Sequence, residues 1–361
     1  MEKEPAARAP RKHKKLRRLV SAILTLLLFA YLFVHISYTY RGYEMQTEFY
    51  GIPKNSLDVV FFGTSITFSG ILPMELYNTH GFTSYVMATN MQYEGSLRWN
   101  LREVQKTQSP KLFVIDITPF VLETYPTNAE YTEDERDLYF KYNIDSLKYS
   151  LNRAAIVEES ANALGLGLMD RLSWHLDLSR YHTNLPNIAK WNNSRKPLQY
   201  GFDYLAKNGQ SVVDVSAMLT DDGSSMPLAE GSEKNLSLLI EEAGKAKGEV
   251  IFMCSPMSFR KERQYRIKNH VMEKIREAGF VFWDFTKDRE KIGLDYATDY
   301  WNYCHFDALG AEKVSANLGR TLKENFDLPD RRADRSAPEW DQGYPLWLER
   351  FESYKNTDRS R

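Results

Sequence analysis

The sequence contains only two cysteines, Cys254 and Cys304. Their wide spacing does not match a zinc ribbon, a haem attachment site or a CxxC redox motif. Two interpretations of the pair stay open. The cysteines are either two buried free thiols or, in an exported protein, one disulfide, because Cys254 ends a predicted strand and Cys304 adjoins His305 near the same rim.

The sequence also lacks an excess of charge, with a formal net charge of -1 at pH 7. It therefore has no long-range field for capturing nucleic acid, and no nucleic-acid partner is expected. It has no glycine-rich phosphate loop, which argues against a cytosolic nucleotide-binding protein. The acidic run 130–137 (EYTEDERD) has no accompanying histidine and is interpreted as a solvated face. Neither a metal nor a cofactor is expected.

A long uncharged segment, from Leu19 to Ile36, lies near the N-terminus. A bilayer core of about 30 Å needs roughly 20 helical residues, so this segment is long enough to span it. Basic residues crowd the segment before it, which predicts a cytoplasmic N-terminus and an exported remainder. Those residues are Arg8, Arg11, Lys12, Lys14, Lys15, Arg17 and Arg18.

A cleaved signal peptide is the main alternative to a membrane anchor. Its apolar region would be shorter, about 7–15 residues, and would end in small residues of the A-x-A kind. Here the run ends in Tyr38, Tyr40 and Arg41. We therefore expect a basic cytoplasmic segment at 1–18 and an uncleaved signal anchor at 19–40, which makes this a single-pass protein of the cell membrane.

Short apolar runs alternate with amphipathic stretches in the exported part, which is expected to begin with a connector at 41–56. The predicted strands are 57–62, 83–88, 111–117, 249–254 and 280–285, and the predicted helices are 96–108, 232–246, 262–278 and 308–325. Strands that are apolar on both faces and separated by helices predict an α/β domain with a parallel sheet covered on both sides.

This predicted domain spans 57–326, and its alternation is interrupted from 119 to 230. The interrupting segment is interpreted as a helical insertion over the carboxyl edge of the sheet, where loops carry function. Residues 327–361 are expected to form a loosely ordered polar tail. Its aromatic residues, among them Trp340, Trp347 and Phe351, could dock it back as one short amphipathic piece.

Gly63-Thr64-Ser65 directly follows the first predicted strand. A serine in a tight turn at the carboxyl end of a buried strand gains exposure, and its own backbone N–H can face a developing oxyanion. Gly63 lets the chain turn there. Strand–Gly–x–Ser turns also occur at phosphate sites and as simple caps, so this motif needs a second element.

His305 supplies that second element. It follows the last predicted strand and precedes the last helix of the domain, which places it at the same edge of the sheet as Ser65. A general base must come within about 2.6–3.2 Å of the group whose proton it takes, and this topology allows that approach. Ser65 and His305 are therefore the candidate nucleophile and base.

Three blocks resemble the SGNH (GDSL-like) hydrolase family. The block 61–71 (FFGTSITFSGI) is similar to the first block of its membrane-anchored members. Residues 109–116 (SPKLFVID) resemble their PKxxVxD strand, and 305–313 (HFDALGAEK) resemble their closing block. The resemblance covers roughly residues 55–118 and 248–325 and leaves the middle unmatched.

The resemblance implies a three-layer flavodoxin-like fold and a Ser–His(–Asp) site that handles esters. Members with this arrangement of anchor and domain include the D-alanyl-lipoteichoic acid transfer protein and polysaccharide O-acetylation proteins. These often work beside a multi-pass membrane-bound O-acyltransferase, which the resemblance suggests as a partner.

The sequence departs from the family at the acid of the triad. The family places an acid three residues before the histidine, and here that position is Asn302. An asparagine can orient the imidazole but cannot stabilise its positive form electrostatically. Asp299, one turn earlier, and Asp284, at the end of the fifth strand, are the alternative acids.

The sequence also departs from the family in its oxyanion-hole blocks, which are not recognisable. The nearest amide donors, Asn90 and Gln92, follow the second strand, and Gly63 completes the candidate oxyanion and substrate-binding set. Ile66 and Asp307 replace the histidine and asparagine that close relatives carry.

These residues predict an extracytoplasmic serine-dependent esterase or O-acyltransferase. Its substrate is expected to be an ester-linked acyl group on a cell-envelope polysaccharide or teichoic acid, handled through an acyl-enzyme. The alternative is a non-catalytic envelope protein that uses the same fold to bind polymer or to assist a membrane-bound O-acyltransferase.

Overall fold

The computed structural model describes residues 11–40, 48–126, 128, 130–145, 147–176, 198–205 and 219–359. The chain forms two compact units. One comprises residues 1–42 and 172–193, and the other comprises 43–171 and 194–361. The first ten residues and the connector residues 41–47 lie outside the described part, as do the last two residues of the expected tail.

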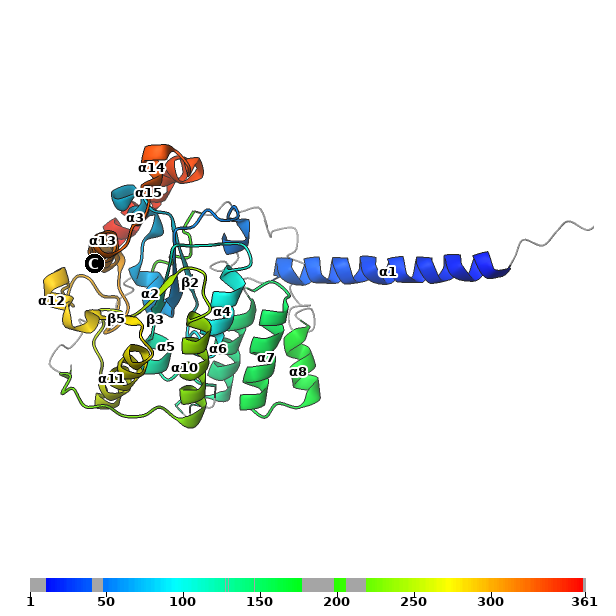
Figure 1. Cartoon of the computed structure of the whole chain (residues 1–361), viewed down its shortest axis with the longest axis horizontal. Helices are drawn as coiled ribbons and strands as arrows, with labels where there is room; N and C mark the ends of the chain where they lie inside the picture. Colours follow the sequence, from blue (N-terminus) through cyan, green and yellow to red (C-terminus); the bar gives the residue numbers. More distant parts are fainter. Residues whose placement is uncertain are drawn as a thin grey trace, which may run out of the picture. The chain divides into compact units, whose positions relative to one another are not determined.

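The larger unit is built on a five-stranded sheet (Figure 1). Its strands are β1 (Val59–Gly63), β2 (Ser84–Ala88), β3 (Leu112–Asp116), β4 (Glu249–Cys254) and β5 (Val281–Asp284). They pair in the order β2-β1-β3-β4-β5, and every pairing is parallel. The prediction of an α/β domain with a parallel sheet is confirmed, and each strand lies where the apolar runs placed it.

One face of the sheet packs against three helices, which are α2 (Ser65–Gly70), α3 (Pro73–His80) and α13 (Ala308–Asn325). Alternate strand residues such as Phe61, Val86 and Val114 form a core here with Phe68 of α2 and Leu318 of α13. Because successive strand side chains point to opposite faces, Val60 and Phe62 are left for the other side, where they are also buried.

The other face carries α4 (Ser96–Val104), α10 (Glu230–Ala243) and α11 (Glu262–Glu277). Helix α4 contacts β1 and packs against α10, while α11 contacts β5. In Figure 1 these helices lie on the side of the sheet away from α3 and α13. Right-handed crossovers between parallel strands give this two-sided arrangement.

The segment between β3 and α10 is helical, and it lies where the sequence placed an insertion. It contains α5 (Thr118–Val121), α6 (Glu133–Asp145), α7 (Leu151–Ala163) and α8 (Leu168–His175). Helix α7 packs against α4 and α6. Two stretches of the predicted insertion, 177–197 and 206–218, lie outside the described residues.

The C-terminal segment folds into α14 (Arg331–Asp334) and the 22-residue helix α15 (Pro338–Arg359). Trp340 and Trp347 are buried, and the Trp340 ring stacks on Tyr200 with 3.7 Å between centroids. Helix α15 also contacts α3 and α13. The expectation of a loosely ordered tail with one short docking piece was wrong, because the burial of these aromatic side chains holds a long helix against the body.

The remaining short elements connect the sheet to these helices. They are the 3-10 helices η1 (Glu48–Gly51) and η4 (Phe285–Lys287) and the α-helix α12 (Arg289–Ile292). None of them contains Ser65 or His305.

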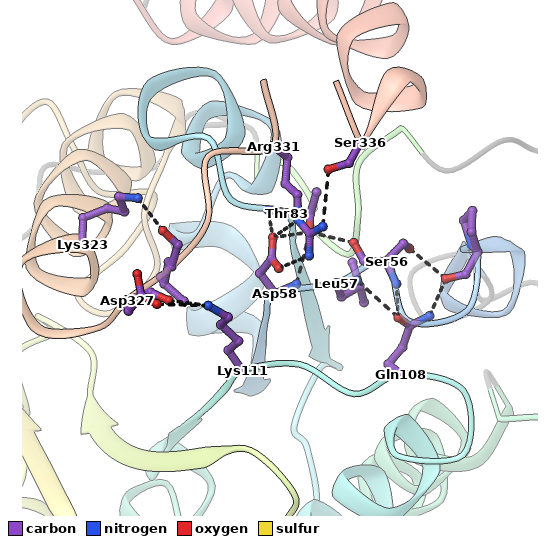
Figure 2. A network of polar contacts seen from close by, with 12 residues as sticks. Ser56, Leu57, Asp58, Thr83, Gln108, Lys111, Lys323, Asp327, Arg331 and Ser336 are labelled. Atoms are coloured by element: carbon purple, nitrogen blue, oxygen red, sulfur yellow. Dashed lines mark hydrogen bonds and ion pairs between the residues drawn. The ribbon is translucent and has the colours of Figure 1, made fainter. Parts of the chain in front are cut away.

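A polar network closes the amino edge of the sheet (Figure 2). The carboxylate of Asp58, which is buried just before β1, accepts hydrogen bonds from the N–H and hydroxyl of Thr83. Arg331 of α14 donates to both oxygens of the same carboxylate, at 3.0 Å from Nε and 2.6 Å from a terminal nitrogen. This network ties the C-terminal segment to the ends of the strands opposite Ser65.

The smaller unit contains α1 (Arg11–Tyr40). Its residues His13–Phe33 form a helix of 21 residues that is long and apolar enough to cross a membrane. Within the described part of the chain, no other helix meets that criterion.

Candidate active site

Ser65 is the first residue of α2, directly after β1. Thr64 caps this helix, since its hydroxyl accepts a hydrogen bond from the N–H of Ile66, 3.3 Å away. The first N–H groups of a helix have no partner within the helix, so the N–H of Ser65 is available to an incoming group. Gly63 is required beneath this turn, because a Cβ there would lie 1.9 Å from the Thr67 hydroxyl.

The Ser65 hydroxyl lies 2.6 Å from Nε2 of His305. His305 belongs to the loop between α12 and α13, far from Ser65 in sequence, and the parallel sheet brings the two together at its carboxyl edge. The candidate nucleophile and base are therefore in hydrogen-bond contact, within the distance that proton transfer requires.

Asn302 fixes the orientation of the imidazole. Its side-chain oxygen Oδ1 accepts hydrogen bonds from the backbone N–H groups of Cys304, at 3.0 Å, and His305, at 2.9 Å. Two N–H donors identify this atom as the oxygen of the amide. Nδ1 of His305, 3.1 Å from the same oxygen, must then carry the ring proton, which leaves a lone pair on Nε2 to receive the Ser65 proton.

Burial lowers the pKa of His305 to about 4. Desolvation disfavours the imidazolium, and the amide of Asn302 carries no negative charge to oppose that effect. Trp301 adds an apolar wall, with its ring edge-on to the imidazole at 5.7 Å between centroids. At neutral pH the histidine is therefore uncharged and can act as a base.

Asp116 is a site residue that the sequence analysis treated only as the end of a strand. Its buried carboxylate accepts hydrogen bonds from the Thr67 hydroxyl at 3.1 Å, the Ser255 hydroxyl at 2.5 Å and the N–H of Thr118 at 3.0 Å. These donors follow β1, β4 and β3, so one carboxylate holds three turns, including the turn that carries Ser65. Burial raises the pKa of Asp116 to about 6.

The two alternative acids lie away from the imidazole and are paired with lysines. Asp299 forms an ion pair with Lys313 of α13 at 2.6 Å, and Asp284 forms one with Lys268 of α11 at 2.7 Å. Within the described part of the chain, neither carboxylate contacts His305. Of the three residues proposed to orient the histidine, Asn302 is therefore the one in place.

The predicted oxyanion set is mostly not available to a ligand. The side-chain nitrogen of Gln92 donates to Ser96 and, at 2.6 Å, to Asn143 within a buried network. Gly63 is buried under Thr67, so its role is steric. Asn90, partly exposed after β2, is the one candidate of this set that lies at the surface of the carboxyl edge.

Both cysteines are buried free thiols, so no disulfide joins them. The Cys304 sulfur lies 3.3 Å from Nδ1 of His305 and 3.4 Å from Oδ1 of Asn302. Cys304 therefore packs against the back of the imidazole, away from Ser65. Burial raises the pKa of this thiol to about 12, which keeps it protonated.

Among the described residues, no group of three or more His, Cys, Asp and Glu side chains is arranged to hold a metal ion. No protein family model matches the chain, and no curated protein matches it significantly. Interpretation of the site therefore rests on its own geometry.

Proposed function

We propose that this protein is an extracytoplasmic serine-dependent esterase or O-acyltransferase with an SGNH-like, flavodoxin-type fold. The observation that carries this proposal is the 2.6 Å contact between the Ser65 hydroxyl and Nε2 of His305, with Nδ1 oriented by Asn302. A hydroxyl paired with an oriented neutral imidazole is the arrangement of an activated nucleophile.

In the proposed reaction, the Ser65 oxygen attacks the carbonyl carbon of an acyl ester while its proton passes to Nε2 of His305. The carbonyl oxygen becomes an oxyanion, which the N–H of Ser65 can stabilise. The intermediate collapses, the alcohol leaves with the proton from His305, and the acyl group stays on Ser65. Water or a polymer hydroxyl then gives its proton to His305 and attacks the acyl carbon, the bond from that carbon to the Ser65 oxygen breaks, and His305 returns the proton to Ser65.

The proposed location follows from α1 and the basic residues at its start. A helix with a strongly basic N-terminal flank inserts with that flank in the cytoplasm, which would export the unit that carries Ser65. The substrate available there is an acylated envelope polysaccharide or teichoic acid. A membrane-bound O-acyltransferase would be a natural donor of acyl groups to such a site.

Labelling with a fluorophosphonate probe tests the proposed nucleophile. The detergent-solubilised chain should be labelled, and Ser65→Ala and His305→Ala should each abolish labelling. Ser69→Ala is the matched control, because Ser69 lies on the same helix and donates to the Ile66 carbonyl away from His305. Labelling that survives Ser65→Ala would refute the assignment of the nucleophile.

One observation favours a second candidate function. In the described structure no carboxylate contacts the imidazole, so the imidazolium formed during acyl transfer would lack an opposite charge. A non-catalytic protein that binds polymer or assists an acyltransferase would have no need of one. Mass analysis of envelope polymers separates the two, because Ser65→Ala at normal protein levels changes polymer acylation only if Ser65 is catalytic.

A further inference from the structure

Helix α8 (Leu168–His175) carries an exposed apolar face. Leu168 and Met169 are 71% and 75% exposed, Leu172 is 43% exposed, and Leu176, whose N–H continues the helical hydrogen bonds, is 44% exposed. At about 100° of rotation per residue, these four positions fall within about 100° of the helix circumference. They therefore form one stripe along the helix, which we call the α8 stripe.

The α8 stripe is not the side by which the helix is attached to the protein. Trp174 lies on the opposite side of the helix and is only 6% exposed. Arg171, next to the stripe, turns toward α7 instead, where its guanidinium donates to Glu158 at 3.0 Å. Figure 1 shows α8 beside α7. The polar and aromatic side of α8 thus makes the contacts with the protein, and the apolar stripe is left outside.

Elsewhere on the surface, exposed apolar side chains occur singly. Among the described residues outside α1 and α8, the exposed large apolar residues are one each on α6, α7, β5 and α15, namely Leu138, Leu151, Val281 and Leu346. Single exposed apolar residues are normal, but several gathered on one face mark a surface that interacts with something. The α8 stripe is therefore the apolar surface that needs an occupant.

The membrane proposed for α1 lies within reach of this surface. The apolar part of α1 ends at Phe33, and the helix continues to Tyr40, about 10 Å further on. Seven residues then join Tyr40 to Glu48, which separates the two by at most about 30 Å. The chain from Leu172 to Asn193 also groups with α1 in the smaller compact unit. An apolar surface on this chain therefore stays close to the bilayer.

Charge favours lipid over a second copy of the chain as the occupant. The sequence from 178 to 202 contains no aspartate or glutamate, and its basic residues are Arg180, Lys190, Arg195 and Lys196. These four lie outside the described residues and are not part of the α8 stripe. Basic residues beside an apolar helix face are attracted to anionic lipid headgroups, whereas a second copy would bring the same positive charge and repel.

We propose that the α8 stripe inserts into the surface of the bilayer that α1 spans and forms a second attachment to the membrane. A helix that binds in this way lies parallel to the surface, with its apolar side about 5–10 Å deep at the boundary between headgroups and acyl chains. This role rests on the membrane anchor of the proposed function and is independent of catalysis by Ser65. It would hold the protein at the membrane surface, close to polymers that are attached there.

A fluorescent label on the stripe tests this attachment. The full chain carrying Met169→Cys is labelled with the environment-sensitive dye NBD and reconstituted into vesicles of phosphatidylcholine and phosphatidylglycerol. Cys254 and Cys304 are buried, so the new thiol is the one that reacts. Its emission should shift to shorter wavelength, and a lipid nitroxide at the top of the acyl chain should quench it more than one at the chain end.

The same label at Leu346→Cys is the matched control, because Leu346 is a single exposed leucine on α15. It should emit as in water and should not be quenched by either lipid. Leu168→Ser combined with Leu172→Ser should give the Met169→Cys label that same behaviour. Both leucines are exposed, so their replacement should leave the fold intact.

Three results would overturn this attachment. Emission from the stripe as in water would show that nothing covers it. A shift to shorter wavelength without quenching would show that a second copy covers it and not lipid. Stronger quenching by the nitroxide at the chain end, or quenching that survives the two serine substitutions, would show that the label does not report a shallow helix held by the stripe.

The chain with both serine substitutions separates this attachment from the anchor. It should stay with the vesicles through a wash in alkaline carbonate, because a membrane-spanning helix resists a treatment that releases surface-bound proteins. Release of that variant overturns the anchor and the attachment together. Retention of the variant, with no quenching of the label on the intact stripe, overturns the attachment alone and leaves the proposed function standing.

Discussion

His305 is oriented by a neutral neighbour, and this has a chemical consequence. In the described structure the imidazole interacts with Asn302, the Ser65 hydroxyl, Trp301 and the Cys304 thiol, none of which carries a charge. The pKa of His305 falls to about 4 as a result of burial. A base with so low a pKa is unprotonated at neutral pH, but its affinity for a proton is low, so the driving force for proton transfer from Ser65 is small.

Asn302→Asp should therefore raise the reactivity of Ser65. The backbone N–H groups that now donate to Asn302 would stabilise a carboxylate there, and the carboxylate would stabilise the imidazolium in the transition state. In a serine protease the reverse change costs about 10⁴ in rate. We expect a gain of at least about tenfold in the second-order rate of fluorophosphonate labelling at pH 7.

The pH dependence of the same rate checks the cause. His305 must be neutral to take the Ser65 proton, so wild-type labelling should fall only as the pH drops through about 4. The added carboxylate would raise the pKa of His305 and move this limb to higher pH. Asn317→Asp on α13 is the control, since its new charge would face Arg320 and not His305. A faster rate with an unmoved limb would refute the electrostatic explanation.

Elements that could be predicted from the sequence are those whose pattern is local. The five strands were predicted from short runs of apolar residues. Such runs are visible in the sequence without knowing which strands pair. Ser65 and His305 could be found because each follows a strand end, and the carboxyl ends of parallel strands share one edge.

Features that depend on distant partners could not be predicted. Asp299 was a reasonable acid by spacing, but Lys313 on α13 pairs with it. In the sequence, Asp116 is recognisable only as the end of a strand. Its role depends on the hydroxyls of Thr67 and Ser255, which are distant in sequence and donate to its carboxylate. Helix α15 contains Pro345 and many charges, and what holds it is the burial of aromatic rings against residues as remote as Tyr200.

The link between α14 and the start of β1 permits a prediction about stability. Asp58 is almost fully buried, and Arg331 supplies the charge opposite it (Figure 2). Arg331→Met should lower the free energy of unfolding by about 3–5 kcal/mol, because it leaves a buried carboxylate without its cation. Urea unfolding of the detergent-solubilised chain measures this change.

A double substitution shows whether charge is the cause. Asp58→Asn together with Arg331→Met removes both charges and should recover most of the stability that Arg331→Met loses. The network lies at the amino edge of the sheet and Ser65 at the carboxyl edge, so the folded variants should be labelled by fluorophosphonate at the wild-type rate. A double variant as unstable as Arg331→Met would show that packing, not charge, makes the contribution.

At the scale of the whole molecule, the N-terminal helix and the unit that carries Ser65 differ in how their apolar side chains are covered. The helix His13–Phe33 is long and apolar enough for a membrane, and its start is strongly basic. The unit that carries Ser65 has its own core on both faces of its sheet and does not need the helix to bury it. The role that we propose for the helix is therefore that of a membrane anchor for the unit that carries Ser65.

The proposed orientation, with the N-terminus in the cytoplasm, rests on the six Lys and Arg residues between Arg11 and Arg18. Alkaline phosphatase, which is active only after export, should be active when fused behind Arg361 and expressed in a bacterium. Replacing those six residues with glutamine should lower that activity, because the basic flank holds the N-terminus in the cytoplasm.

The size of the exported chain distinguishes an anchor from a cleaved signal peptide. Tyr38, Tyr40 and Arg41 stand where a signal peptidase requires small residues, so an N-terminal epitope tag should remain on the membrane-bound chain. A released, untagged chain with active phosphatase would support the exported location and would contradict the proposed anchor. An inactive fusion on a stable chain would contradict export itself, and an envelope polymer could then no longer be the substrate of Ser65.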